Sequence, residues 1–562
     1  MVAQPLRLGY NLGKYRYFDA SFKKENCMKR FLSILLSIML MVTFLPEAAF
    51  AKSAVPEGKA ISTASDFLAI ADNPKGTYYL TNDIFLPEGA SITKTFKGTL
   101  DGRGYTIQGF AEDEFAMEMG LFRYLSSATV KNLTLSDVNI TVESLGACLA
   151  GGLASKAKNS TIENVHVSGS IAVNDFSWPP AYNYNDEKAR MNYLYVGGLM
   201  GKAEKNTISK CSSDVEISFK GDSSIRVSGI ASLAGICGAA SDCTIKSCSN
   251  TGSITAETEG YKQLSLAGIT GHEEGNNKLS KCTNSGNITA RVKGSEEILH
   301  IARADDFVSI GGIAGDIALG TITSCQNQGD IAVYAWSELD EGSNLEVEVG
   351  GITGWCETVR KSSNSGNISV QAEGNVKADT DLFVGGIAGH YGYISESYNT
   401  GEVYVTSNLK KDCRTYVGGI AGTGDSVFCS DDYYIKNCYN TGDVEFSGGK
   451  DMGWIGGICG GKSYGYIRYN YNSGNIQDNT NEAGAIVGIY SDSGKRKMYY
   501  NYYLSGTAEK AYGEDCGTPK AARAKATRVS SLTSKKCAKL SSEKWVYSKD
   551  LKRMILKNNK EK

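Results

Sequence analysis

A glycine-rich box of the form Gly-Gly-Ile-Ala-Gly recurs along most of this chain and limits what it can fold into. One clear copy is Val417–Gly422, and successive copies begin 33 to 44 residues apart. A motif at a nearly fixed period indicates a repeat protein, in which each unit buries its apolar face against its neighbours. The copies are Gly198–Gly201, Gly235–Gly238, Gly268–Gly271, Gly312–Gly315, Gly351–Gly354, Gly386–Gly389, Gly419–Gly422 and Gly457–Gly460, with weaker ones at Gly152–Ala154 and Gly484–Gly488.

Each repeat reads as three short strands. The box is the first, a short alternating run such as Thr321–Cys325 is the second, and an alternating run such as Glu402–Val405 is the third. An Asn-Thr/Ser-Gly turn precedes the third strand, and we expect a turn there because Asn and Gly tolerate positive φ. These turns are Asn250–Gly252, Asn284–Gly286, Asn364–Gly366, Asn399–Gly401, Asn440–Gly442 and Asn472–Gly474.

Three short strands and two tight corners in each repeat predict an all-β fold, a right-handed parallel β-helix. A β-propeller is the alternative, but its blades need four strands of similar length. The connection from the third strand to the next box varies most in length, and its alternating residues around a central turn predict projecting β-hairpin arms. The long arms are Ile171–Gly197, Ile288–Gly311 and Ile331–Gly350. Insertions on one side of a solenoid often form its binding face.

The start of the chain carries an export signal. Basic residues in Met28–Arg30 precede the 15 apolar or small residues Phe31–Leu45, and Ala49-Phe50-Ala51 matches a signal-peptidase site. We therefore expect a signal peptide at 28–51, with 1–27 as an upstream extension from a misplaced start. The apolar run is shorter than the roughly 20 residues that span a bilayer. The mature protein is predicted to be secreted or cell-surface associated, with no membrane span.

The remaining chain divides into three segments. Residues 52–95 are predicted as an N-terminal lead-in or cap, 96–504 as the repeats, and 505–562 as a basic C-terminal cap and tail. The tail from Glu514 to Lys562 holds 14 Lys or Arg and 5 Asp or Glu, although the net charge of the whole chain is −2. We expect the segment around Trp545 to cover the open end of the repeats, because an uncovered strand edge invites aggregation.

Most of the 15 cysteines occupy repeat phases instead of a disulfide framework. Five share one phase of the repeat, and other repeats place Ser362 and Ser397 there, so pairing is not required. These five are Cys211, Cys248, Cys282, Cys325 and Cys438, and Cys237 and Cys459 lie inside boxes. We expect buried, reduced thiols that act as small apolar side chains. Cys356, Cys413, Cys429 and Cys516 could still pair.

The boxes and their Asn-Thr/Ser-Gly partners resemble the GLUG-motif repeats of bacterial surface and secreted proteins. The resemblance covers roughly Phe96 to Leu504, and the preceding Phe67–Asp72, Tyr78–Ile84 and Phe96–Ile107 resemble the lead-in of such repeats. In that family the repeats occur in adhesin-like proteins and beside the catalytic domain of some immunoglobulin A metallopeptidases. The resemblance therefore implies a surface scaffold.

Signatures of peptide hydrolysis are incomplete. A zinc peptidase needs HExxH on a helix, and of His166, His272, His300 and His390 only His272-Glu273-Glu274 begins that pattern without completing it. We expect these histidines on the surface or in loops. No GxSxG stretch in helical context and no phosphate-binding loop is found.

Two further sets of side chains are candidates for binding or catalysis. Paired carboxylates could serve a polysaccharide lyase or glycoside hydrolase, but none recurs at a phase that would place it beside a partner. They are Asp305-Asp306, Glu338 with Asp340-Glu341, and Asp431-Asp432, and we expect them to aid solubility, with weak Ca²⁺ binding left open. Tyrosines at Tyr464–Tyr471 and Tyr499–Tyr503 are expected to pack the last coils in preference to binding sugars.

These patterns predict an exported, non-catalytic, adhesin-like scaffold, with no catalytic, cofactor or metal residue. We expect it to be a monomer that binds a glycan or a host or bacterial surface protein, to contact anionic cell-wall polymer through its basic tail, and not to bind nucleic acid. A carbohydrate-active enzyme and a purely structural spacer remain as alternatives.

Overall fold

The computed structural model describes most of the chain after the predicted signal peptide. It covers residues 57–561 apart from 115–116, 144–147, 175–191, 222–226, 260, 295–305, 338–344, 375–379, 410–412, 424–432, 449–452, 463–464, 479–482, 491–496 and 516–525. The signal peptide at 28–51, the extension at 1–27, His300 and the predicted acidic arm tips Asp305, Glu338, Asp340, Glu341, Asp431 and Asp432 lie outside these ranges. Gly58–Lys562 form one compact unit, and no helix within the described ranges is long and apolar enough to cross a bilayer.

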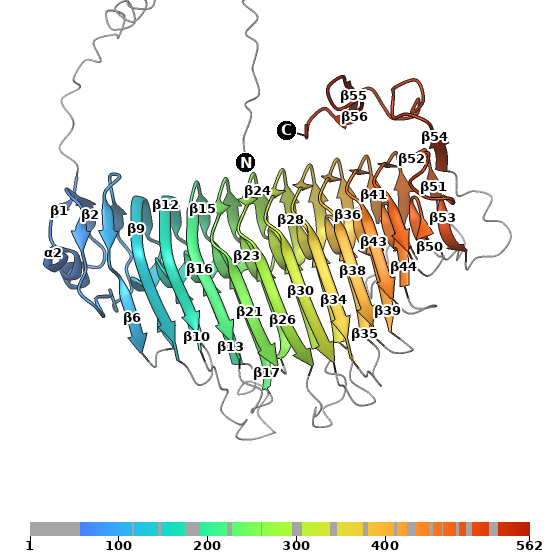
Figure 1. The fold of residues 1–562 in the computed structure, drawn as a ribbon. Coiled ribbons are helices and arrows are strands. Elements are labelled where there is room, and N and C mark those ends of the chain that lie inside the picture. The colour runs from blue at the N-terminus through green and yellow to red at the C-terminus, as the bar shows by residue number, and fades with distance from the viewer. Residues whose placement is uncertain are drawn as a thin grey trace, which may run out of the picture. The chain divides into compact units, whose positions relative to one another are not determined.

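This unit is nearly all β-structure, and its strands pair in parallel with the equivalent strands of the next repeat (Figure 1). For example, β26 (Ile288–Gly294) pairs with β30 (Ile331–Ser337), and β30 pairs in turn with β34 (Ile368–Glu373). Among the described residues only β55 (Trp545–Ser548) and β56 (Arg553–Leu556) pair antiparallel. The prediction of an all-β chain with parallel sheets is confirmed.

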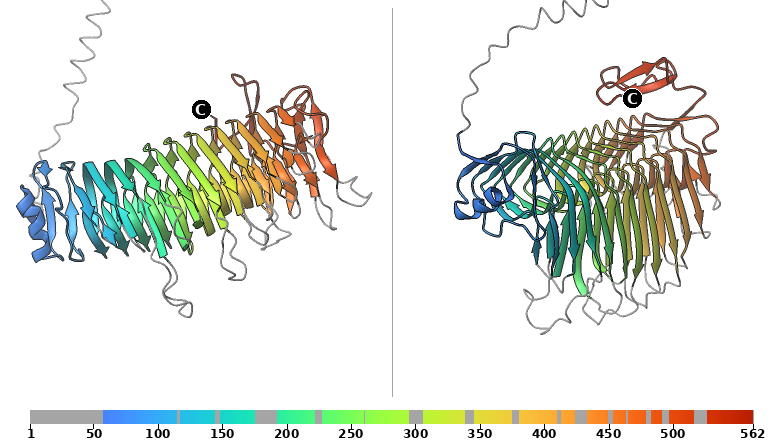
Figure 2. Two further views of the ribbon diagram at one scale, coloured as in Figure 1. Left: turned by 60° about the horizontal axis from the view of Figure 1, so that its bottom comes forward. Right: turned by 60° about the vertical axis from the view of Figure 1, so that its left-hand side comes forward.

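The strands form one large sheet of 43 strands and one of eleven, which Figure 2 shows from two further directions. The strand before each box lies in the eleven-stranded sheet: β7 (Glu118–Met119), β10 (Cys148–Gly151), β13 (Asn192–Gly197), β17 (Val227–Ala234), β22 (Tyr261–Ala267), β27 (Asp306–Gly311), β31 (Leu345–Gly350), β35 (Thr380–Gly385), β39 (Arg414–Gly418), β44 (Gly453–Gly456) and β49 (Ala483–Gly484).

The chain bends at the box and enters the large sheet. The strands that follow the bend are β8 (Phe122–Ser126), β11 (Ala154–Lys158), β14 (Met200–Glu204), β18 (Cys237–Ser241), β23 (Thr270–Glu274), β28 (Ala314–Thr323), β32 (Thr353–Arg360), β36 (Ala388–Ser395), β40 (Ala421–Thr423), β45 (Cys459–Lys462), β50 (Val487–Tyr490) and β53 (Tyr512–Asp515). A second row holds β15 (Thr207–Ser209), β19 (Thr244–Lys246), β24 (Lys278–Ser280), β41 (Tyr434–Lys436), β46 (Tyr466–Arg468) and β51 (Lys497–Tyr499), together with the ends of β28, β32 and β36.

Two more rows complete each repeat. The third is β20 (Ser249–Asn250), β25 (Thr283–Asn284), β29 (Gln326–Asn327), β33 (Ser363–Asn364), β37 (Tyr398–Asn399), β42 (Tyr439–Asn440), β47 (Tyr471–Asn472), β52 (Asn501–Leu504) and β54 (Ala526–Val529). The fourth is β21 (Ile254–Glu259), β26, β30, β34, β38 (Val403–Asn408), β43 (Val444–Gly448) and β48 (Ile476–Asp478). In the first repeats β9 (Thr129–Val142), β12 (Thr161–Val173) and β16 (Ser212–Lys220) run through more than one row. A repeat therefore holds more strand segments than the predicted three.

A short N-terminal segment precedes the repeats. It contains β1 (Lys59–Ile61), α2 (Ala64–Leu68), the 3₁₀ helix η1 (Ala69–Asp72), β2 (Thr77–Leu80), β3 (Ile84–Phe85), β4 (Thr99–Asp101), β5 (Thr106–Gln108) and β6 (Ala111–Glu114). Thr63 caps α2, since its hydroxyl accepts from the Asp66 N–H while the Asp66 carboxylate accepts from the Thr63 N–H. Phe67 of α2 is fully buried and its ring lies 5.9 Å from that of Phe122, which joins this segment to the core of the repeats.

The predicted hairpin arms are not hairpins in the described ranges. Within the arm at Ile331–Gly350, β30 pairs with β26 and β34, whereas β31 belongs to the other sheet and pairs with β27 and β35. The alternation that suggested a hairpin has another cause. The first strand of this arm, β30, buries every second residue in the core, as Ile331, Val333 and Ala335 do. The arms thus extend two stacked parallel sheets.

The Asn-Thr/Ser-Gly motif is also not the turn that we expected. The positive φ angles fall three residues earlier, for example at Lys281, Ser324 and Lys361. The Asn side chains are instead buried and form a ladder through consecutive repeats. From Asn250 to Asn440, each amide Nδ2 donates to the Oδ1 of the next Asn at 2.8–2.9 Å. Each amide, that of Asn472 included, also donates to the carbonyl of the Gly two residues on. The members are Asn250, Asn284, Asn327, Asn364, Asn399, Asn440 and Asn472.

Glycine is required at both motifs because the repeats approach closely. A Cβ added to Gly312, the second glycine of its box, would lie 2.2 Å from Cγ of Asn327, and one added to Gly286 would lie 2.0 Å from the carbonyl oxygen of Gly252. The box therefore leaves space for the Asn ladder, and the glycine of the Asn motif allows the backbones of adjacent repeats to touch. The two motifs recur together because they pack against each other.

The cysteine prediction is confirmed for the repeat phase. Cys211, Cys248, Cys282, Cys325 and Cys438 are buried free thiols, each 1% exposed or less. They line the core beside the Asn ladder, and the Cys282 N–H points at the Cys325 sulfur 3.4 Å away. Cys429 and Cys516 lie outside the described residues.

The C-terminal segment packs along the flank of the repeats instead of only closing their end. Trp545 is buried against the rings of Tyr439 and Tyr471, and its Nε1 donates to Oδ1 of Asn437 at 3.3 Å. Further back along the flank, the Asn559 amide donates to the backbone carbonyls of Ser362 and Glu396. The packing role predicted for the tyrosines is confirmed for Tyr471, whereas Tyr500 remains 41% exposed.

The Asn ladder predicts a large stability loss on truncation of a central member. Asn327→Ala removes three hydrogen bonds and leaves buried partners unsatisfied, so we expect the free energy of unfolding to fall by about 3 kcal/mol. Asn287→Ala, at an exposed Asn of a neighbouring repeat, should cost less than about 1 kcal/mol. Urea unfolding followed by far-ultraviolet circular dichroism measures both, and equal losses would contradict the ladder.

Candidate functional site

Side chains from the two sheets meet where the chain bends at each box, on the face opposite the apolar core. We call this row of side chains the junction. It is built from the outward residues of the eleven-stranded sheet and from the residue that directly follows each box. In order along the repeats, that residue is Lys202, Ala239, His272, Asp316, Trp355, His390, Thr423 and Gly461. Opposite it run Tyr195, Ser232, Ser265, Ser309, Glu348, Phe383, Tyr416 and Trp454.

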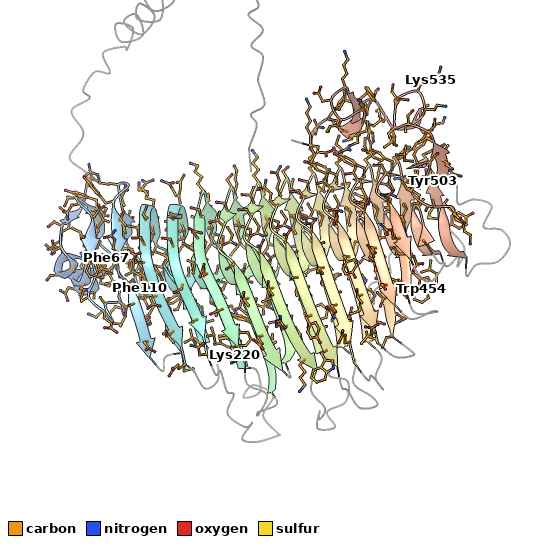
Figure 3. All side chains as sticks on the ribbon, viewed as in Figure 1. Phe67, Phe110, Lys220, Trp454, Tyr503 and Lys535 are labelled. Atoms are coloured by element: carbon orange, nitrogen blue, oxygen red, sulfur yellow. The ribbon has the colours of Figure 1, made fainter. Side chains whose placement is uncertain are left out.

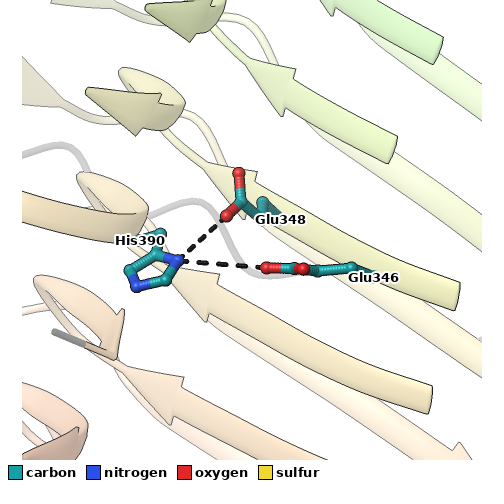
Figure 4. Close-up of side chains that lie close together, drawn as sticks. All are labelled: Glu346, Glu348 and His390. Atoms are coloured by element: carbon teal, nitrogen blue, oxygen red, sulfur yellow. Dashed lines mark hydrogen bonds and ion pairs between the residues drawn. The ribbon is translucent and has the colours of Figure 1, made fainter. Parts of the chain in front are cut away.

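The centre of the junction holds two carboxylates and an imidazole (Figure 4). Glu346 and Glu348 lie two residues apart on β31 and therefore on one face, and His390 reaches them from β36. The Nδ1 of His390 lies 3.0 Å from Oε1 of Glu348 and 4.0 Å from Oε1 of Glu346. The side chains of Glu348 and His390 are 2% and 8% exposed, whereas that of Glu346 is 34% exposed.

The environment of this cluster favours protonated carboxyls. Burial, and then the charge of Glu348, raise the pKa of Glu346 to about 7. Burial, followed by the charge of Asp316, raises the pKa of Glu348 as well. The Ser309 hydroxyl donates to Oε2 of Glu348 at 3.4 Å and opposes that rise. Two like charges in a buried site cannot easily ionise together, so the pair holds a proton more readily than free carboxyls do.

A second polar group precedes the cluster along the junction. The amide Nε2 of Gln263 lies 3.3 Å from both Nδ1 of His272 and Oδ2 of Asp316, and these two ionisable groups are 3.7 Å apart. The ring of Tyr195 stacks on His272 with centroids 6.2 Å apart. The expectation that the histidines occupy loops or the surface is wrong for His272 and His390, which lie on strands and are largely buried.

Sequence reasoning missed Glu346, Glu348 and His390. Leu345–Gly350 was interpreted as one side of a hairpin, so its two glutamates carried no site meaning. A signal was nevertheless present, because His272 and His390 each directly follow a box and so share one phase of the repeat. Of the carboxylates that were singled out in the arm tips, Asp306 begins β27 beside Leu345 of β31, and the others lie outside the described residues.

The incomplete zinc motif does not form a catalytic zinc site. His272-Glu273-Glu274 lies on the strand β23, whereas HExxH needs a helix to bring its two histidines together. Successive strand residues point to opposite faces, and Glu273 accordingly points into the core, 2% exposed, while His272 points to the junction. We therefore derive no hydrolytic step from this stretch.

The N-terminal part of the chain is similar in sequence to proteins that are described as proteases. Residues 50–169 match the family described as the M26 IgA1-specific metallo-endopeptidase N-terminal region. A curated relative, the immunoglobulin A1 protease of Streptococcus sanguinis, is 36% identical over 156 residues, which are 26% of this chain and 7% of that protein. The chain thus matches only a small part of the length of this relative.

Two solved structures also overlap with the chain. One, described as a candidate immunoglobulin A1 protease from Bacteroides ovatus, has a TM-score of 0.36 and 16% identity, and the match covers 49% of this chain and 79% of that one. The other is described as an IgA1 protease, with a TM-score of 0.32 and 19% identity over 55% of this chain and 21% of that one. Neither overlap bears on function at this level of similarity.

These matches correct two predictions. The family that matches is the metallo-endopeptidase N-terminal region, and not the GLUG-motif repeats. The non-catalytic, adhesin-like function that followed from that resemblance is also wrong, since the matching family is a region of metallo-endopeptidases and the curated relative is described as a protease. The match at 50–169 ends before the first strong box at Gly198, in the part that was interpreted as a lead-in and first repeats.

Buried Glu273 predicts a pH-dependent stability. Burial raises its pKa well above the ordinary 4.5, and the nearby Thr270 and Asn277 only partly oppose this. The folded state therefore binds a proton that the unfolded state releases above pH 4.5. The contribution of Glu273 to the free energy of unfolding should fall as pH rises above 4.5, by roughly 1 kcal/mol for each pH unit, until the raised pKa is reached.

Glu273→Gln should remove this dependence, because the amide does not titrate. We expect the variant to be more stable than the parent at pH 8 and nearly equal to it at pH 4, as measured by urea unfolding. Glu163→Gln, at a carboxylate that pairs with Lys210 on the surface, is the control. A parent stability that does not change between pH 5 and 8 relative to Glu273→Gln would contradict a raised pKa.

Proposed function

We propose that this chain acts in the endoproteolysis of immunoglobulin A1, as the N-terminal region of a secreted metallo-endopeptidase. The observation that carries the proposal is the match of residues 50–169 to the family region of that description, supported by the 36% identity to the S. sanguinis protease. Within such an enzyme we assign to the described unit the engagement of the immunoglobulin. The expected monomeric state, the contact of the basic tail with cell-wall polymer and the lack of nucleic-acid binding stay predictions.

The finer fold belongs to this proposal. We infer a right-handed parallel β-helix, because equivalent strands of successive repeats pair in register from β11 to β50. Connections between parallel strands of one sheet are right-handed in about 98% of cases. A stack of this kind presents long, rigid surfaces, as repeat proteins that bind large partners do.

An aromatic row at one end of the junction is the surface that we propose for the immunoglobulin. Phe383, Tyr416 and Trp454 come from consecutive strands β35, β39 and β44. Their rings stack at centroid distances of 5.6 and 5.0 Å, with interplanar angles of 17° and 23°. Tyr416 and Trp454 are half-buried, and Figure 3 labels Trp454 on its strand. Rigid aromatic side chains with exposed edges are typical of residues that dominate protein–protein binding energy.

Binding to immunoglobulin A1 tests the proposal. We expect the immobilised chain to bind immunoglobulin A1 more tightly than immunoglobulin G, and Trp454→Ala to weaken that binding at least about tenfold, or ~1.4 kcal/mol. Biolayer interferometry at several concentrations measures both.

The matched control is Trp336→Ala. Trp336 is also half-buried, but it lies on β30 of the large sheet, with Lys293 4.9 Å above its ring. Its removal should leave the affinity within about twofold. Equal binding to both immunoglobulins would overturn the proposal, whereas selective binding that Trp454→Ala leaves unchanged would overturn the assigned surface. A second readout is competition, since excess chain should slow the cleavage of immunoglobulin A1 by the S. sanguinis protease.

A further inference from the structure

We propose that Glu346, Glu348 and His390 form a binding site for a divalent transition-metal cation, with Zn²⁺ as the best fit. Each side chain offers one ligand atom, and these atoms all lie within 4.8 Å of one another. The inference rests on this geometry and does not depend on the proteolytic role proposed above.

The three ligands are held on rigid backbone. β31 carries both glutamates and pairs on its two sides with β27 and β35. β36 carries His390 and pairs with β32 on one side and with β40 and β41 on the other. Sites built on paired strands keep their geometry better than sites on loops, so little ordering would be needed when the ion binds.

The charges around the cluster favour a cation. Both carboxylates make their ion contact with the same imidazole, through Nδ1 of His390. The nearby Arg414 pairs with Asp381, which lies beside Glu346 in the adjacent strand. Once both carboxyls ionise, two negative charges face one imidazole in a site where Glu348 is 2% exposed. Buried charge is costly unless it is paired, and a divalent cation would compensate it.

The donor set points to a zinc-like ion. Zn²⁺ accepts imidazole nitrogen and carboxylate oxygen at about 2.0–2.2 Å and can be held by three protein ligands with water in the fourth position. Ca²⁺ and Mg²⁺ prefer sites made of oxygen alone, so the imidazole argues against them. The partial exposure of Glu346 leaves a side open to water.

Neighbouring side chains would orient the ligands. The Ser309 hydroxyl donates to Oε2 of Glu348, which leaves Oε1 directed toward His390. The ring of Phe383 lies 5.2 Å from that of His390 and restricts its rotation. Supporting contacts of this kind are a regular part of metal sites.

Metal titration of the full chain tests the site. After chelator treatment and dialysis, we expect isothermal titration calorimetry to show saturable Zn²⁺ binding, and Zn²⁺ to raise the thermal unfolding midpoint. Glu348→Gln and His390→Gln should each weaken Zn²⁺ binding at least about tenfold and abolish the shift in the midpoint. Glutamine keeps the side-chain size close to that of the parent, and far-ultraviolet circular dichroism verifies the fold.

Matched variants control for general effects. Glu163 is an exposed carboxylate and His166 a histidine bonded to Ser212, and both lie on β12 away from the junction. Glu163→Gln and His166→Gln should therefore bind Zn²⁺ as the parent does. Unchanged Zn²⁺ affinity in His390→Gln, or equal loss in the controls, would overturn the site.

Cobalt substitution separates this site from the cysteines. Co²⁺ bound by carboxylates and imidazole shows visible d–d bands without the near-ultraviolet band of cobalt–thiolate bonds, which is the expected spectrum. A thiolate band would assign the metal to the core cysteines and overturn the proposal. If either glutamine variant fails to fold, anomalous diffraction from zinc-soaked crystals of the unmodified chain decides, by placing the ion beside Glu346 or elsewhere.

Discussion

The stacking of this chain depends on a ladder of buried asparagines that only glycine can accommodate. Each amide must give its two protons to the next asparagine and to its own repeat's glycine carbonyl, because an unsatisfied buried donor costs about 1–3 kcal/mol. In the boxes from Gly235 to Gly457 the second glycine faces this ladder, and any side chain there would strike the amide. One polar interaction thus accounts for both motifs of the repeat and for the fixed register of the strands that follow them.

The periodic features of the fold could be predicted from the sequence, whereas their local geometry could not. Period, strand alternation and the buried cysteines such as Cys282 follow from residues that recur at one phase. The role of Asn284 could not be deduced in the same way. An Asn-Ser-Gly sequence forms a turn in most contexts, and only the neighbouring repeats make the amide a ladder member. The prediction of hairpin arms was wrong for a related reason. Apolar and polar residues alternate in the same way in a hairpin strand and in a strand of two stacked sheets.

The junction was hidden because its members come from different repeats. Glu348 and His390 are 42 residues apart. They meet because β36, which follows one box, lies beside β31, which precedes the box of the previous repeat. The functional prediction failed on a different point. It gave most weight to the boxes from Gly198 onward, whereas the similarity to endopeptidases lies in residues 50–169, where the boxes are weak. Features that define the stacking of repeats carry little information about what the molecule does.

The asparagine ladder has a direction, and this limits how such a chain can lengthen. Each amide from Asn250 to Asn440 donates to its C-terminal neighbour, and Asn472 is the last acceptor. At the first member, Oδ1 of Asn250 has no hydrogen-bond partner in the described part of the chain, and after the last member the equivalent position is Tyr503. A repeat duplicated inside the ladder would find a donor on one side and an acceptor on the other. A repeat added outside it would meet Ser213 or Tyr503 instead. A repeat duplicated inside the ladder would therefore keep its amide hydrogen bonds, whereas one added at either end would stack without them, as the repeats before Asn250 do.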